Sequence, residues 1–316
     1  MSEKIVIFIG MTLLWLFLPY GITMLMTGTA NAQEEAEQSG IMVEYEQQGQ
    51  VLSMDLEEYM VGVLAAELPQ DYNYEVYKAQ AVITRTNARK LAKDGNQLSG
   101  AQLQMGYYSE AEMESSLGTQ RCAEYRQKLK NAIRETYGEV LTYEGNYIDA
   151  LYHSVSVGKT ASALDVYGKD VPYLVSVASS GDVEAKDYMS NVTFTYEQLV
   201  EKLGGDAAAV QQNYGLSQDN YISQISIAEK SEAGYVKKVQ LGSQVKTGEE
   251  FRNMLSLPSL YFYMENLNGT LRIVSLGKGH GLGMSQFGAN KMANEGKDYK
   301  DILKYYFQNA EISEIN

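Results

Sequence analysis

A lone carboxylate, Glu67, is the first side chain in this sequence whose position suggests chemistry. It falls in the last turn of a predicted helix that Asp55 can cap and that must stop at Pro69, because proline cannot donate the next helical hydrogen bond. The helix dipole makes this end unfavourable for a negative charge, and Leu64 and Leu68 favour partial burial of the carboxyl group. Both effects favour the protonated form that a general acid needs.

Two basic side chains follow on a second predicted helix, which starts at about Tyr74. Lys78 and Arg85 are seven residues apart and therefore share one face of that helix. An acid at a helix end opposite such a basic stripe is a plausible catalytic arrangement, with Lys78 and Arg85 holding substrate at some distance from Glu67. An ordinary surface ion pair is the competing interpretation, and the spacing alone slightly favours it.

A glycine-rich loop at residues 277–286 is the second candidate, and it contains His280 and Ser285. Alternating glycines let the backbone bend sharply and let a large ligand approach the main chain. Ser285 can cap the helix that follows, whose free N–H groups would then face the same concavity. A histidine on such a loop is more often exposed and functional than buried, but similar glycine patterns also occur in inert hairpins.

Other catalytic classes fit the sequence less well. Ser154 adjoins His153 on a predicted strand, so their side chains point to opposite faces, and the sequence contains no G-x-S-x-G motif. Cys122, the single cysteine, lies in a polar helical stretch and cannot form an intramolecular disulfide. One cysteine and two histidines are too few for a structural zinc site. We therefore expect no metal and no other cofactor.

Composition places the 316-residue chain among folded proteins and argues against one class of partner. Hydrophobic residues make up 45% of the chain and charged residues 21%, which is ordinary for a globular protein. The formal net charge of −14 argues against a nucleic-acid partner, because phosphate binding needs a basic surface.

Residues 5–26 carry no charge and are long enough to cross a bilayer, which takes about 20 apolar residues. Lys4 precedes this stretch and acidic residues follow it, which favours a cytoplasmic N-terminus and an exported remainder. A signal peptide cleaved near Ala30 is the alternative. The expected organisation is an anchor at residues 1–27, a flexible spacer at 28–41 and a folded domain at 42–316.

The elements expected around these residues are mixed helices and strands. Alternating apolar residues predict a hairpin after Ile41, and Gly145 and Gly269 mark the turns of two further hairpins. Glycines make the segment near 93–120 a loop-rich insertion. This element order favours an α+β fold over a doubly wound sheet. Helices are also predicted at 125–137, 196–203, 247–255, 285–293 and 299–307, and strands at 171–179, 221–231 and 235–244.

Several motifs, in order, resemble the signature of the stage II sporulation protein D (SpoIID/LytB) family. They are DLEEYMVGVLAAELP at 55–69, YKAQAVITRT at 77–86, HS at 153–154 with GKT at 158–160, GEEFR at 248–252, GKGHGLGMSQFGA at 277–289 and YKDILKYYF at 299–307. Together they span nearly everything from about residue 42 to 312. The apolar N-terminal stretch and the length resemble the sporulation branch of the family, rather than its larger amidase-enhancer proteins.

The resemblance implies an α+β domain of helices and antiparallel hairpins around a glycan-binding groove, preceded by a transmembrane helix. It implies a membrane-anchored lytic transglycosylase that cleaves the bond between N-acetylmuramic acid and N-acetylglucosamine in peptidoglycan and leaves a 1,6-anhydro end. Family members act in forespore engulfment, between the mother-cell and forespore membranes. The implied partners are peptide-stripped glycan strands, a cell-wall amidase and a membrane scaffold protein. A non-catalytic activator of that amidase is the alternative.

The resemblance also assigns roles to individual residues. Glu67 takes the position of the family's catalytic acid, which suits lytic cleavage because the sugar's own C6 hydroxyl replaces the water that a second carboxylate would activate. Some clostridial members bind zinc with the histidine of the HS motif and cysteines shortly after it. The sequence after Ser154 has no such cysteine, so this zinc should be absent. The implied substrate-binding positions are Lys78, Arg85, His153, Ser154, His280, Ser285 and Gln286.

Overall fold

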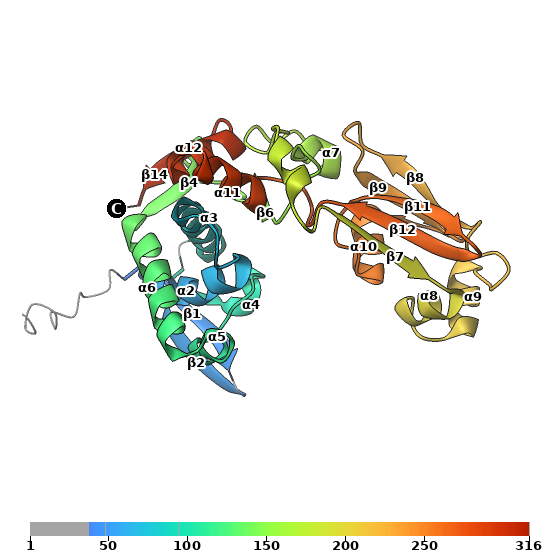
Figure 1. Ribbon diagram of the computed structural model, residues 1–316, viewed down its shortest axis with the longest axis horizontal. Helices are drawn as coiled ribbons and strands as arrows, with labels where there is room; N and C mark the ends of the chain where they lie inside the picture. Colours follow the sequence, from blue (N-terminus) through green and yellow to red (C-terminus); the bar gives the residue numbers. More distant parts are fainter. Residues whose placement is uncertain (1–37, 48, 94, 316) are drawn as a thin grey trace, which may run out of the picture. The chain divides into compact units, whose positions relative to one another are not determined.

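The computed structural model describes residues 38–47, 49–93 and 95–315 (Figure 1). The predicted membrane anchor at residues 1–27 and most of the predicted spacer lie outside these residues. Among the helices that are described, none combines the length and the apolar character needed to cross a membrane. The α+β class is confirmed, because helices and mainly antiparallel strands alternate along the chain.

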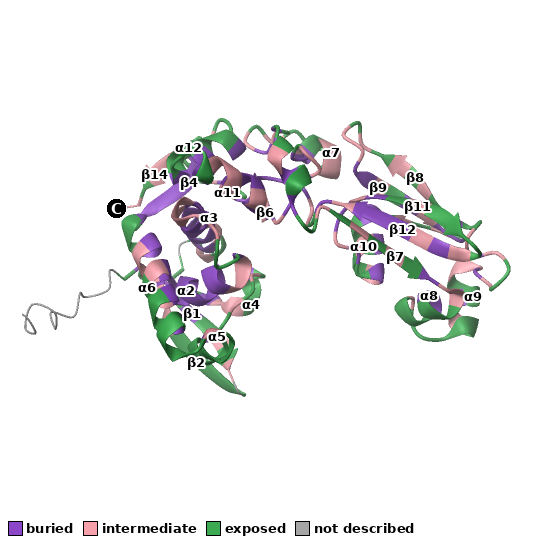
Figure 2. Ribbon diagram, in the orientation of Figure 1, coloured by how far each residue is buried: buried purple, intermediate pink, exposed green. Residues whose placement is uncertain are grey.

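The first part of the chain builds one hydrophobic core around two long helices, α2 (Leu56–Glu67) and α3 (Tyr74–Ala92). The predicted hairpin is confirmed as β1 (Met42–Gln47) paired antiparallel with β2 (Gln50–Asp55). Helix α6 (Thr119–Glu135) packs against both α2 and α3. Both long helices are purple over most of their length in Figure 2, because their residues are largely buried.

The segment predicted to be a loop-rich insertion is more regular than expected. It contains β3 (Gln97–Ser99), which pairs parallel with β1, and the helices α4 (Gly100–Leu103) and α5 (Glu110–Leu117). Each helix starts with a capping box, in which the N-cap serine and the side chain three residues later exchange hydrogen bonds with the backbone. These boxes allow short helices to form between the glycines that suggested a loop.

The end of the chain returns to the first core. Helices α11 (Gln286–Asn294) and α12 (Tyr299–Tyr306) agree with the predicted closing helices, and both contact α3. Strand β14 (Glu311–Glu314) pairs antiparallel with β4 (Glu139–Tyr143), which also forms the predicted second hairpin with β5 (Asn146–Tyr147).

A second hydrophobic core lies between two three-stranded sheets and three helices. One sheet has the order β11-β12-β7, and the other has the order β10-β9-β8. Within this core the rings of Phe251 and Phe262 stack with centroids 5.8 Å apart. The elements are β7 (Met189–Phe194), α8 (Tyr196–Lys202), α9 (Ala207–Tyr214), β8 (Ile225–Lys230), β9 (Val236–Leu241), β10 (Gln244–Thr247), α10 (Gly248–Leu255), β11 (Tyr261–Leu267) and β12 (Thr270–Leu276).

Short elements occupy residues 151–188 and meet the glycine-rich loop. Strand β6 (Tyr152–His153) pairs parallel with β13 (Met284–Ser285). Helix α7 (Ala163–Tyr167) and the 3-10 helix η1 (Ser180–Glu184) follow. The predicted strand at 171–179 is wrong, since this segment forms turns and a single isolated bridge between Lys159 and Ala178. Its apolar residues are buried by packing on the first core rather than by sheet formation.

Candidate active site

Helix α2 places Glu67 at its last position. The Asp55 side chain caps the helix by accepting a hydrogen bond from the Glu57 N–H at 2.9 Å. The helix ends because Leu68, which precedes a proline, adopts an extended backbone with φ −121°. The predicted helix and its proline stop are therefore confirmed, and the carboxyl group of Glu67 emerges where the helix finishes.

The Glu67 side chain is half-buried and is held by the loop between α4 and α5. Its Oε1 accepts a hydrogen bond from the Gly106 N–H at 2.6 Å. The loop can approach this closely because Gly62 in α2 has no side chain, since a Cβ there would lie 2.6 Å from Cδ2 of Tyr107. On the other side, burial raises the pKa of Tyr152, and the charge of the neighbouring Glu67 carboxylate and a hydrogen bond to it raise that pKa further.

Pairing of β6 with β13 brings the two histidines together, with ring centroids 5.9 Å apart. Leu282 sets their tautomers: its carbonyl lies 3.0 Å from Nδ1 of His153, and its N–H donates to Nδ1 of His280 at 3.1 Å. Neutral His153 therefore carries its proton on Nδ1, and neutral His280 carries its proton on Nε2. Nε2 of His153 is buried without a hydrogen-bond partner among the described residues.

Both imidazoles are uncharged at neutral pH. Burial lowers the pKa of His153 to about 4, although its hydrogen bond to Leu282 opposes the shift. Burial also lowers the pKa of His280 to about 3, with added repulsion from His153 and Arg252. His280 can therefore offer its Nε2–H to a ligand without adding charge, while the charge of the site comes from other side chains.

A network of buried side chains fixes the glycine-rich loop. Ser285 is fully buried and caps α11 as predicted, accepting from the Gly288 N–H at 3.2 Å. Its hydroxyl donates to Asp182 at 2.7 Å, and Asp182 also accepts from the Ser156 N–H at 2.6 Å. The next residue, Gln286, donates to the Gln80 side chain of α3 at 3.2 Å, which ties the loop to the first core.

A pocket of about 640 Å³ lies beside Glu67 and the glycine-rich loop. Of the predicted site residues, Glu67, His153, Ser154, His280 and Gln286 line it, which brings together residues from opposite ends of the chain. Glu67 is the only carboxylate among the described residues of its wall, and the cationic side chains in that wall are Arg252 and Lys278. The described wall therefore combines one acid, two neutral histidines, Arg252 and Lys278, whose Nζ also lies 3.7 Å from Asp187.

Comparison with known proteins decides the family. The family described as stage II sporulation protein (SpoIID) matches residues 44–143, a range that contains Glu67. Stage II sporulation protein D of Bacillus amyloliquefaciens is 33% identical over 274 residues, 84% of this chain and 76% of that protein. The protein of the same name from Bacillus subtilis (strain 168) is 34% identical over 277 residues, with the same shares covered. This chain belongs to the stage II sporulation protein D family.

A more distant relative of this SpoIID-family chain is the amidase enhancer of Bacillus subtilis (strain 168). It is 25% identical over 295 residues, which cover 78% of this chain but only 39% of the enhancer.

Lys78 and Arg85 do not lie where the motifs of the SpoIID family suggested. Arg85 is fully buried, and its guanidinium forms a bidentate pair with Glu57 through bonds of 2.8 and 2.7 Å. Lys78 pairs with Glu75 at 2.6 Å and lies over the ring of Tyr299. The expectation that these two side chains line a cleft beside Glu67 does not fit the structure, because each is already satisfied by other parts of the fold.

The structure adds site residues to those that the sequence singled out in this SpoIID-family chain. Tyr152 precedes the HS motif, Arg252 ends the GEEFR motif and Lys278 lies inside the glycine-rich loop, so all three were within or next to quoted motifs. Their role was not predicted because only the folded chain shows that they share a pocket wall with Glu67 and His280. The two histidines could contribute to a metal site, but no cluster of three or more His, Cys, Asp or Glu ligands occurs among the described residues.

Proposed function

We propose that this SpoIID-family protein is a peptidoglycan lytic transglycosylase, with Glu67 as its catalytic acid and base. The observation that carries the proposal is that Glu67 is the single carboxylate among the described residues lining a pocket of otherwise neutral and cationic side chains. Ordinary glycosidases use two carboxylates on either side of the scissile bond. A lytic enzyme needs only one, because the sugar supplies the nucleophile.

In this reaction protonated Glu67 donates its proton to the oxygen that links C1 of N-acetylmuramic acid to C4 of N-acetylglucosamine. The C1–O bond breaks, and the C6 hydroxyl of the same muramic acid bonds to C1. The ionised carboxylate then takes the hydroxyl proton, which restores Glu67. The products are a 1,6-anhydro-muramic acid end and a free C4 hydroxyl on N-acetylglucosamine.

The surrounding residues support this chemistry. The Gly106 N–H fixes the orientation of the carboxyl group through Oε1. Arg252 and Lys278 offer positive charge to a carboxylate on the substrate, such as the lactyl group that muramic acid bears after its peptide is removed. His280 can hydrogen-bond sugar hydroxyl and acetamido groups through Nε2 without adding charge.

We also propose that the enzyme works in forespore engulfment, anchored by residues 5–26 with its domain outside the cell membrane. The sporulation names of its Bacillus relatives support the setting. Its substrate would be glycan strands already stripped of peptide, so a cell-wall amidase and a membrane scaffold protein are the proposed partners. The distant likeness to an amidase enhancer supports a second candidate, a glycan-binding activator of that amidase without cleavage of its own.

The test is mass spectrometry of peptide-stripped glycan strands incubated with the full chain. We expect anhydro-ended fragments from the wild type and none from Glu67→Gln, which should still bind the strands. Glu201→Gln, an exposed change in α8, is the matched control and should keep full activity. If the wild type releases no anhydro ends but accelerates a cell-wall amidase, the activator is the correct function.

A further inference from the structure

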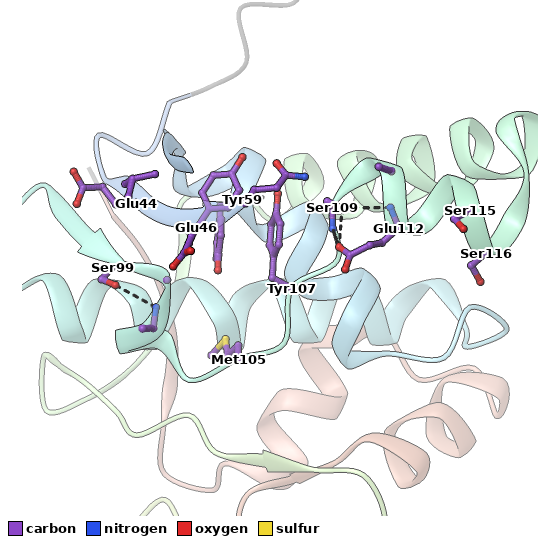
Figure 3. Close-up of a pocket in the computed structure, with 16 residues that line it drawn as sticks. Glu44, Glu46, Tyr59, Ser99, Met105, Tyr107, Ser109, Glu112, Ser115 and Ser116 are labelled. Atoms are coloured by element: carbon purple, nitrogen blue, oxygen red, sulfur yellow. Dashed lines mark hydrogen bonds between the residues drawn. The ribbon is translucent and has the colours of Figure 1, made fainter. Parts of the chain in front are cut away.

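A second pocket, of about 1040 Å³, adjoins the candidate active site (Figure 3). It lies between the β1–β2 hairpin, α2 and the segment from Ser99 to Ser116. Met105 belongs to the walls of both pockets. Tyr107, in the wall of the second pocket, directly follows Gly106, which holds Glu67. The two pockets are therefore neighbours across one short stretch of backbone.

Three tyrosines form one wall of this second pocket, which we name the tyrosine pocket. Tyr59 and Tyr107 stack with centroids 4.6 Å apart and planes at 10°, and Figure 3 shows them together near Met105. Tyr45 tilts against them at 5.6 and 5.1 Å. Tyr59 is buried, whereas Tyr45 and Tyr107 are half-exposed, so parts of two aromatic rings face the pocket. An aromatic surface of this kind packs well against the C–H face of a sugar ring.

The rest of the wall mixes polar and apolar residues, and the charged side chains among its described residues are all negative. Glu44, Glu46 and Glu112 contribute carboxylates, and four serines contribute hydroxyls. No Lys, Arg or His occurs among the described residues that line this pocket. The carboxylates can accept hydrogen bonds from hydroxyl and amide groups of a ligand, and the serine hydroxyls can donate or accept them. The carboxylates repel a negatively charged ligand.

The two pockets differ in charge, and so do the two sugars that alternate along a peptide-stripped glycan strand. Arg252 and Lys278, in the wall of the pocket that contains Glu67, suit the carboxylate of a peptide-stripped muramic acid. The other sugar of the strand, N-acetylglucosamine, has no charge and suits a pocket with aromatic faces and carboxylate acceptors.

We infer that the tyrosine pocket binds an uncharged N-acetylglucosamine unit of the same strand that Glu67 cleaves, with the sugar ring packed on Tyr45 and Tyr107. The inference deepens the proposed function, since it takes its substrate class from that function. It makes the tyrosine pocket a determinant of how long a strand must be to bind tightly.

Calorimetric titration of the full chain with chitobiose and chitohexaose, two neutral oligomers of N-acetylglucosamine, tests the inference. The wild type should bind chitohexaose more tightly than chitobiose. Tyr107→Leu should weaken the binding of both oligomers about tenfold, because each places an uncharged sugar on this ring. Tyr108→Leu, an exposed neighbour outside the tyrosine pocket, is the matched control and should bind both as the wild type does.

Tyr45→Leu, on a different element, repeats the test in case Tyr107→Leu does not fold. Unchanged chitohexaose binding in the folded tyrosine variants would overturn the inference, and so would equal affinity of the wild type for both oligomers. These measurements involve no cleavage. Absence of anhydro products in mass spectrometry would therefore overturn the transglycosylase function. It would not affect the calorimetric test of whether binding depends on oligomer length.

Discussion

Lowering the pH from 7 to 5 should destabilise the folded state of this protein through His153, which is only 4% exposed. Burial lowers the pKa of His153 from 6.5 to about 4 in the folded chain. Between these two values, the unfolded chain binds a proton on this imidazole and the folded chain does not. Falling pH in this window therefore shifts the equilibrium toward the unfolded chain.

The size of the effect follows from the pKa difference. A histidine with a pKa of 6.5 when unfolded and about 4 when folded should cost about 2 kcal/mol of stability at pH 5 relative to pH 7. That loss is large beside the roughly 5–15 kcal/mol that stabilises a typical domain. Below pH 5 the titration of carboxylates would obscure the contribution of His153, so the comparison stops there.

The assay is urea unfolding of the wild type and His153→Gln at pH 7 and pH 5. Glutamine can still donate a hydrogen bond to the Leu282 carbonyl, but it does not titrate. We expect the variant to lose about 2 kcal/mol less than the wild type over this interval. Equal losses would show that the folded chain protonates His153 as readily as the unfolded chain does, and would refute the argument from burial.

Two further changes test contacts that position Glu67 and its helix. Arg85→Leu leaves the Glu57 carboxylate buried without its partner and should cost about 3–5 kcal/mol in urea unfolding. The matched change of the exposed Arg121 to Leu should cost less than about 0.5 kcal/mol, and similar losses in both would contradict a buried pair. Gly62→Ala should cost about 1–3 kcal/mol because the new methyl group meets the Tyr107 ring. It should also speed amide hydrogen exchange in residues 104–108, and unchanged exchange would show that the loop is not docked on α2.

The helices that carry the site were predictable because local signals set their ends. Asp55 caps the start of α2, Pro69 prevents its continuation, and Ser285 caps α11. The region after α3 was interpreted as loop from its glycines, although Ser99 and Ser109 each have a capping partner three residues later. A search for those pairs would have found α4 and α5.

Long-range pairing decided the rest of the site. Arg85 finds its partner 28 residues earlier in the chain, and sequence spacing cannot distinguish such a buried pair from a substrate-binding arginine. His153 and Leu282 are 129 residues apart and meet where β6 pairs with β13 and Ala161 pairs with Leu282. Five of the predicted site residues line the pocket, because the family motifs mark residues at these junctions, whether each residue binds a ligand or holds the fold.

Because of the same β6–β13 pairing, the parts of the pocket are synthesised at different times during translation. The ribosome makes Glu67 early and the partner strand of His153 late, so a growing chain carries the acid long before its surroundings exist. A chain that ends before the glycine-rich loop lacks His280 and Gln286, which line the pocket with Glu67. The pocket can therefore form only after synthesis has passed β13.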